Sequence, residues 1–201
     1  LPENILEGMP ELIFISGLAS YMMDSFELAQ TNLKNYINQT KSQSSEEELT
    51  KSVESNLKKA IALLVDIYAK QNRPTDAIDL LEKHQRVTRT DHSLLLAQCS
   101  LYLSNNKAYK CQLLLETMKK RFGENIGTDL MHVKVLLSQK QHQAALEYFE
   151  AYFTERTDVE ILETAVTLYM LNGQIEKAYV SVNKLLENSP DKEAYLTMKI
   201  D

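Results

Sequence analysis

The sequence contains few of the residues that interrupt helices or cross-link secreted proteins. Its 201 residues include five glycines, four prolines and two cysteines, and tryptophan is absent. So few glycines and prolines leave little of the turn chemistry that an all-β fold requires. Two cysteines are too few for a small disulfide-rich secreted scaffold, and we expect reduced thiols and a cytoplasmic location.

Long apolar runs are also missing, and the sequence has little clustered positive charge. No stretch reaches the roughly 18 to 20 apolar residues of a membrane span, and the first residues lack the basic start of a signal peptide. The formal net charge is −6. This charge argues against a nucleic-acid partner, because such binding depends on counterion release by clustered lysine and arginine. The one basic cluster, at 119–121, falls at an expected helix end, where positive charge favours the helix dipole.

Motifs for catalysis and cofactor binding are absent as well. The four histidines form no His-Glu-x-x-His pattern, no Cys-x-x-Cys accompanies them, and there is no glycine-rich phosphate loop. We therefore expect no catalytic residue, no metal site and no cofactor. Cys99 and Cys111 are interpreted as small apolar residues that face each other inside one helix pair, with a redox pair as the alternative.

What the sequence does contain is a helix-favouring composition with a regular repeat. Four segments align: LVDIYAKQNRPTDAIDLLEKHQ, LAQCSLYLSNNKAYKCQLLLETM, VKVLLSQKQHQAALEYFEAYF and LYMLNGQIEKAYVSVNKLLENSP. Each has a small residue at the same place, and these residues recur at intervals of 34, 34 and 33: Ala77, Cys111, Ala145 and Ala178. A large residue follows four positions later on the same helix face. A fixed period of this length is typical of a solenoid of stacked helix pairs.

This pattern resembles the tetratricopeptide repeat (TPR) family, whose units are helix-turn-helix pairs of this length. The last copy matches best, with Tyr169, a turn glycine at Gly173, Ala178 and a closing Pro190. The resemblance implies an all-α fold, a right-handed α-solenoid of about five TPR-like hairpins. Asn72 and Asn106 occupy turn positions where the family favours glycine.

The expected hairpins occupy about 10–40, 46–86, 91–121, 126–154 and 158–188, followed by a terminal helix at about 190–200. We expect the whole chain to form one repeat domain, part of a longer array. The polar segment QTKSQSSEEELTKS adds 14 residues to the interval between Ala29 and Ala77. It predicts a loop from Thr40 to Ser45 and then a long helix from Glu46 to Gln71.

In the family that the sequence resembles, the first helices of successive hairpins line a concave groove. The positions one turn away from the predicted core would form this groove here. They are Ala62, Asp66, Ala69, Leu96, Ser100, Leu103, Leu130, Lys134, Leu137, Thr167 and Met170. The leucines and the methionine would be apolar anchors for a partner's peptide or helix. The alternative is ordinary helix surface or partial core.

The function that this resemblance implies is a non-catalytic scaffold or adaptor, a subunit of a larger cytosolic complex that binds a protein partner. Family members that hold chaperone tails clamp a carboxylate with Lys, Asn and Arg side chains. The aligned positions here are Ala62, Asp66, Ala97 and Ser93, so we expect no such clamp. Two alternatives remain open: an RNA-binding module of similar repeats, or a regulatory subunit that supports an enzyme complex.

Overall fold

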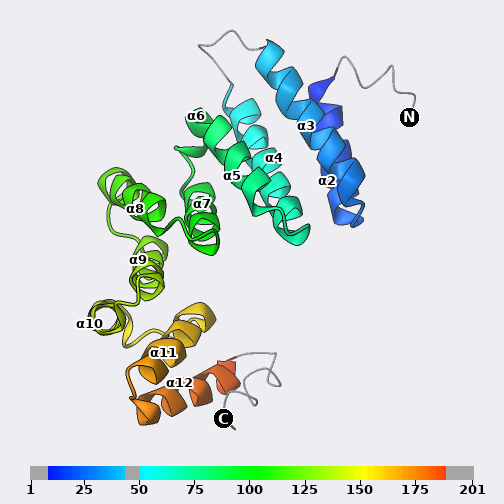
Figure 1. The fold of residues 1–201 in the computed structure, drawn as a ribbon. Coiled ribbons are helices and arrows are strands. Elements are labelled where there is room, and N and C mark those ends of the chain that lie inside the picture. Colours follow the sequence, from blue (N-terminus) through cyan, green and yellow to red (C-terminus); the bar gives the residue numbers. More distant parts are fainter. Residues whose placement is uncertain (1–8, 44–49, 189–201) are drawn as a thin grey trace. The chain divides into compact units, whose positions relative to one another are not determined.

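The computed structural model describes residues 9–43 and 50–188, which form eleven α-helices (Figure 1). The chain divides into two compact units, at 1–105 and 106–201. The described helices of unit 1 are α2 (Pro10–Met22), α3 (Phe26–Gln43), α4 (Lys51–Lys70), α5 (Pro74–Lys83), α6 (Gln85–Thr88) and α7 (His92–Ser104). Those of unit 2 are α8 (Ala108–Phe122), α9 (Ile126–Ser138), α10 (His142–Phe153), α11 (Val159–Leu171) and α12 (Ile175–Asn188).

Within each unit, the long helices pack mainly on the nearest long helices in the sequence. In unit 1, α2 packs on α3, α3 on α4, α4 on α5, and α5 on α7, while the short α6 touches α4, α5 and α7. In unit 2 the order is α8, α9, α10, α11 and α12, with α11 and α12 forming a close pair (Figure 1). This neighbour-to-neighbour packing confirms the predicted all-α fold of sequential hairpins.

Local sequence signals fix where several helices begin. Pro10 and Pro74 are the first residues of α2 and α5, where proline costs no hydrogen bond. The Asp91 carboxylate accepts a hydrogen bond from the Leu94 amide at 3.0 Å and so caps α7. Asn125 caps α9 through the Gly127 amide at 2.9 Å. Each cap satisfies a backbone donor that the first helical turn leaves without a partner.

The turns between paired helices share one backbone conformation. The residues with positive φ are Asp24, Asn72, Asn106, Lys140, Gly123 and Gly173. All except Gly123 lie in a turn between the two helices of a predicted hairpin, and they follow the spacing of the repeat. After four of these residues, the next amide donates to the carbonyl five positions earlier: Ser25 to Ser20, Arg73 to Tyr68, Gln141 to Leu136 and Gln174 to Tyr169. This is the Schellman arrangement, which ends a helix and starts the return.

At two of these turns, adding a side chain and removing one should change the stability of the protein in opposite directions. A left-handed backbone costs a side-chain-bearing residue about 1 kcal/mol relative to glycine. Lys140, with φ of 60°, should therefore gain stability as Lys140→Gly, and Gly173, with φ of 70°, should lose stability as Gly173→Ala. No atom lies within 4 Å of an added Cβ at Gly173, so the loss is due to the backbone alone. Urea denaturation of both variants measures the two signs, and equal signs would contradict the assignment.

The core confirms the small-then-large register predicted from the repeat. The five small residues of the second helices are buried: Ala29, Ala77, Cys111 and Ala145 have no exposed surface, and Ala178 is 3% exposed. The large residues four positions later are buried with them: Leu33, Leu81, Leu115, Phe149 and Val182. The small-then-large pattern therefore marks the buried side of each second helix.

Gly17 shows the same rule on a first helix. A Cβ at this position would come within 2.9 Å of two Leu33 carbon atoms. Helices α2 and α3 can therefore pack this closely only because residue 17 has no side chain. Gly17 precedes Val65 by 48 residues, the same interval that separates Ala29 from Ala77. The first hairpin thus keeps the small first-helix residue that Val65 replaces in the second.

Several predicted boundaries were wrong. Helix α3 continues through Thr40 to Gln43, because Thr40 is buried and its hydroxyl donates to the Tyr36 carbonyl at 2.8 Å. Helix α4 does not begin at Glu46, because the Thr50 side chain accepts from the Val53 amide and caps a helix that starts at Lys51. The short α6 was not predicted. The terminal helix expected at about 190–200 lies outside the described residues.

Candidate functional site

The predicted groove positions on α4 lie along one side of that helix. Ala62 and Ala69 are exposed, and Asp66 between them is half-buried. Asp66 forms an ion pair with Lys70 at 2.9 Å and accepts a hydrogen bond from the Tyr21 hydroxyl on α2. Burial alone would raise the pKa of Asp66, but these two hydrogen bonds outweigh it and hold the pKa below its usual value. Asp66 therefore links α4 to α2 and leaves small side chains exposed beside it.

The predicted positions on α7 form a similar stripe. Ser100 is exposed, and Leu96 and Leu103, one on each side of it along the helix, are half-buried. The opposite side of α7 faces the core, where Gln98 and Tyr102 are buried. Leu96 and Leu103 thus present part of their apolar surface, with only a serine side chain between them.

On α9, the structure divides the three predicted positions. Leu130 is only 4% exposed and belongs to the core cluster of unit 2, so the prediction that it is an exposed anchor was wrong. Leu137 is half-buried and packs against the same cluster. Lys134 is half-buried and forms an ion pair with Glu160 on α11. The face of α9 turns further into the core than the spacing of these residues suggested.

On α11, both predicted positions are exposed. The Thr167 hydroxyl donates to the Glu163 carbonyl at 3.0 Å, and the Met170 side chain is 50% exposed. Met170 is consequently more accessible than any of the predicted groove leucines.

The two cysteines are buried without exposed surface, as the packing interpretation requires. Cys99 lies on α7 in unit 1 and Cys111 lies on α8 in unit 2. Their predicted position opposite each other in one helix pair remains a prediction, because the two helices belong to different units.

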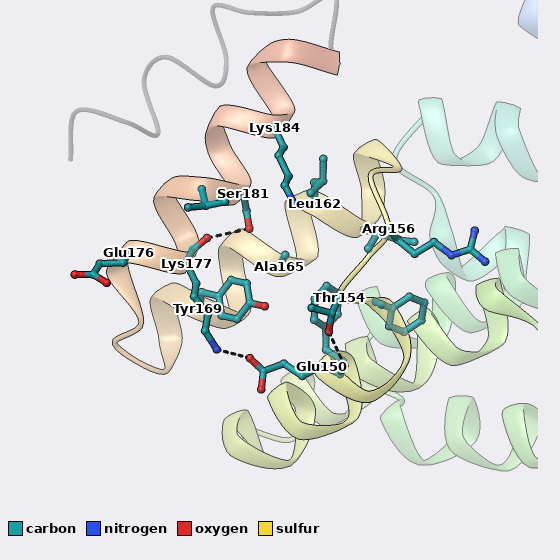
Figure 2. Close-up of a pocket in the computed structure, with 14 residues that line it drawn as sticks. Glu150, Thr154, Arg156, Leu162, Ala165, Tyr169, Glu176, Lys177, Ser181 and Lys184 are labelled. Atoms are coloured by element: carbon teal, nitrogen blue, oxygen red, sulfur yellow. Dashed lines mark hydrogen bonds and ion pairs between the residues drawn. The ribbon is translucent and has the colours of Figure 1, made fainter.

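A cavity that was not predicted from the sequence lies in unit 2, lined by α10, α11 and α12 (Figure 2). Its volume is about 380 Å³. We call it the α10–α12 groove. Its apolar lining consists of buried side chains: Phe149, Phe153, Ile161, Leu162, Ala165 and Tyr169. Its polar and exposed lining consists of Glu150, Thr154, Arg156, Glu176, Lys177, Val180, Ser181 and Lys184.

Ionic and aromatic contacts close one end of the α10–α12 groove. Lys177 on α12 forms an ion pair with Glu150 on α10 at 2.7 Å, drawn as a dashed line in Figure 2. The Lys177 ammonium also lies 5.4 Å from the centre of the Tyr169 ring. Burial raises the pKa of the Tyr169 phenol, and Glu150 raises it further, so this hydroxyl stays protonated at neutral pH.

A signal for this groove is present in the sequence, although it was not among the predictions. Lys177, Val180 and Lys184 follow one side of α12 at spacings of three and four. Val180 on this stripe is 52% exposed, although valine usually belongs in a core. An exposed apolar residue between two lysines, beside the core face of the helix, is the pattern that marks the groove edge.

A second polar cluster in unit 2 joins three helices. The Lys119 ammonium on α8 donates to the Tyr148 hydroxyl on α10 at 2.9 Å and lies 3.0 Å from the Asp129 carboxylate on α9. Tyr148 in turn donates to Asp129 at 2.7 Å, and its ring contacts that of His132 at 4.7 Å between centres. Burial lowers the pKa of His132, and the nearby Lys119 lowers it further. We call Lys119, Asp129 and Tyr148 the α8–α10 network.

The described parts of the chain offer little that suggests a metal or membrane site. In residues 9–43 and 50–188, no three side chains of His, Cys, Asp or Glu come together in a way that could hold a metal ion. In the same ranges, no helix combines the length and the apolar character needed to cross a bilayer.

Antiparallel helix pairs with this register and these turns define the TPR-type helical-repeat fold, and solved structures agree. TTC0263, a thermophilic TPR protein of Thermus thermophilus, matches with a TM-score of 0.68 at 12% identity, over 94% of this chain and 96% of its own. YrrB, a TPR protein with an unusual peptide-binding site, matches at 0.56 and 15% identity, over 91% and 88%. BtubC of P. vanneervenii matches at 0.56 and 13% identity, over 95% and 81%.

No family model and no curated protein sequence matches this chain. The structural likeness therefore shows the fold, and a fold does not by itself determine a function.

Proposed function

We propose that this chain is a non-catalytic scaffold or adaptor that binds a peptide or helix of a partner protein, as a subunit of a larger cytosolic complex. The proposed binding residues lie, in each unit taken by itself, on the side of the first helices that carries the predicted groove positions. In unit 1 these are Asp66, Leu96, Ser100 and Leu103, and in unit 2 they are Lys134, Leu137, Thr167 and Met170. Leu130 is excluded because it is buried.

The observation that supports this proposal is the mixture of small and apolar side chains left accessible on α4, α7 and α11. Ala62, Ala69 and Ser100 are exposed and small, so a partner backbone could approach these helices closely. Half of the Met170 side chain is exposed, and methionine adapts its shape to varied apolar partners. A stripe of this kind fits helix-in-groove or peptide recognition, in which a few apolar anchors supply most of the affinity.

The charge of the same surface favours a protein over RNA. Its basic member, Lys134, is engaged by Glu160, and Asp66 adds a carboxylate of its own. RNA recognition by helical repeats needs basic side chains that recur in each unit and reach the phosphates. A partner with an apolar recognition segment is the better chemical match.

The decisive variant is Met170→Glu, which places a charge on the proposed surface without removing core volume. Met170 and Leu171 are equally accessible, at 50% and 51%, but adjacent helical residues point about 100° apart. Leu171→Glu is therefore a matched control. Affinity capture from cell extract with mass spectrometry should recover a partner with the wild type and with Leu171→Glu. Capture by Met170→Glu should fall at least about tenfold, because a buried unpaired charge weakens an anchor strongly.

Three results would contradict this function. Equal loss of the partner from both variants would assign the effect to folding or to a different surface. Unchanged capture by Met170→Glu would exclude this part of the first-helix surface. RNA retained by the wild type in a filter assay at physiological salt, without a protein partner, would favour the RNA-binding alternative.

A further inference from the structure

We infer that the α10–α12 groove is a separate docking site for an acidic linear segment of a partner protein, one that places an apolar side chain beside a carboxylate. The groove shares no lining residue with the first-helix surface described above. On α11, its residues Ile161, Leu162, Ala165 and Tyr169 point to the opposite side from Thr167 and Met170, given a rotation of about 100° per residue.

The apolar floor sets the first requirement on the occupant. Phe149, Phe153, Ile161 and Leu162 are each exposed by only 2–3%, yet they border open space of about 380 Å³. This is near the lower end of the volumes found for binding pockets, about 300 to 1,000 Å³. Two helices, α10 and α12, flank the floor, so an extended segment can lower one or two side chains onto it. A flat protein surface cannot reach it.

The charges around the groove set the second requirement. Glu150 is already neutralised by Lys177 at 2.7 Å. Figure 2 shows the Glu176 carboxylate pointing away from the groove on one side and the Arg156 guanidinium pointing away on the other. Lys184, in contrast, extends from α12 toward Leu162, over the floor (Figure 2).

Lys184 is the charge in the groove that is left for a ligand. Within the described residues, no carboxylate forms an ion pair with it, unlike Lys134 and Lys177 in the same unit. A positive charge above an apolar floor attracts a carboxylate attached close to an apolar side chain. The groove is therefore complementary to Asp or Glu next to a residue such as Leu, Ile or Phe.

The Tyr169 hydroxyl adds a neutral donor to this arrangement. Figure 2 shows it directed into the space between α12 and α10, and it makes no hydrogen bond within residues 9–43 and 50–188. It can donate to a carboxylate or to a backbone carbonyl of an extended segment. Ser181 is less available, because its hydroxyl donates to the Lys177 carbonyl at 3.0 Å. Lys184 and Tyr169 together define where the polar part of the ligand lies.

Selection from a random peptide library displayed on phage tests this site without presuming a sequence. The full chain is the bait, and the Lys184→Glu variant is used for counter-selection. We expect the enriched peptides to carry Asp or Glu beside an apolar residue. Synthetic copies, measured by fluorescence anisotropy, should bind Lys184→Glu at least about tenfold more weakly than wild type. Their affinity should also fall as salt rises, because the lysine is partly accessible to solvent.

Two further variants distinguish a specific role of the Lys184 charge from the effect of any change in the protein's net charge or fold. Lys120→Glu makes the same charge change on the exposed part of α8 and should leave peptide affinity within about twofold. Tyr169→Phe keeps the buried ring and removes only the hydroxyl, so it should weaken binding by about three- to tenfold while the fold is retained. Replacing the apolar residue of the peptide with alanine should abolish detectable binding.

Each remaining outcome overturns the inference. If no peptide were enriched, or if the enriched peptides bound Lys184→Glu as tightly as wild type, the groove would not be the proposed docking site. A dimer in sedimentation that Lys184→Glu dissociates would mean that a second copy of the chain fills the groove. If the peptides lost binding to Met170→Glu but kept binding to Lys184→Glu, they would bind the first-helix surface. That result would support the proposed function and reject the α10–α12 groove as their site.

Discussion

Tryptophan in place of Ala145 is expected to unfold unit 2 under conditions where the wild type is folded. Ala145 has no exposed surface, and it belongs to the core cluster that includes Val133, Phe149 and Leu168. An indole ring at this position must displace neighbouring side chains or separate α10 from α9. Overpacking of this size costs about 3 kcal/mol or more. The thermal midpoint followed by circular dichroism should then fall by about 10 °C or more.

The adjacent residue provides the control for this substitution. Ala144 is exposed on the same helix, so Ala144→Trp adds the same volume to the surface and should leave the midpoint nearly unchanged. If both variants melted alike, the register of small residues would not be the feature that holds the hairpin together.

Alanine in place of Asp129 is expected to have the second-largest effect. The Asp129 side chain is mostly buried and receives hydrogen bonds from both Lys119 and Tyr148. Burial alone would lower the pKa of Lys119, but its bonds to Tyr148 and Asp129 raise that pKa, so the lysine stays charged. Removing the carboxylate leaves this charge and the Tyr148 hydroxyl without their acceptor. The expected loss in urea denaturation is about 2 to 3 kcal/mol.

An ion pair elsewhere in unit 2 shows what an exposed contact contributes by comparison. Glu160 is paired with Lys134 but is 66% exposed, so Glu160→Ala should cost less than about 1 kcal/mol. The double variant Lys119→Met with Asp129→Leu should be more stable than Asp129→Ala, because no charge is then left without a partner. Equal losses for Asp129→Ala and Glu160→Ala would show that the α8–α10 network contributes no more than a surface ion pair.

The sequence was sufficient for the repeat register but not for every helix boundary. Ala77, Cys111 and Ala145 could be predicted as buried because close helix contacts admit only small side chains, and spacing reveals them. The burial of Thr40 could not be predicted, because a polar residue in a serine-rich segment indicates a loop when only the sequence is known. Its hydroxyl is satisfied within its own helix, which is how the helix continues.

The binding surfaces were harder to predict than the fold because exposure depends on how helices turn about their axes. Leu130 has the same spacing on α9 that Leu96 has on α7, yet Leu130 is in the core and Leu96 is half-buried. The α10–α12 groove was missed because its floor consists of ordinary core positions, such as Phe149 and Ala165. Only the three-dimensional separation of α10 from α12 leaves these residues facing open space.

The predominance of contacts between helices that are close in the sequence has a kinetic consequence. Even the hydrogen bond from Lys70 to Tyr21, which spans 49 residues, stays within unit 1. Chains dominated by such local contacts close only short loops before native packing is gained, and they fold on the microsecond to millisecond scale. During synthesis, α2 and α3 can pair before α4 has left the ribosome, and each later helix then adds to an ordered edge.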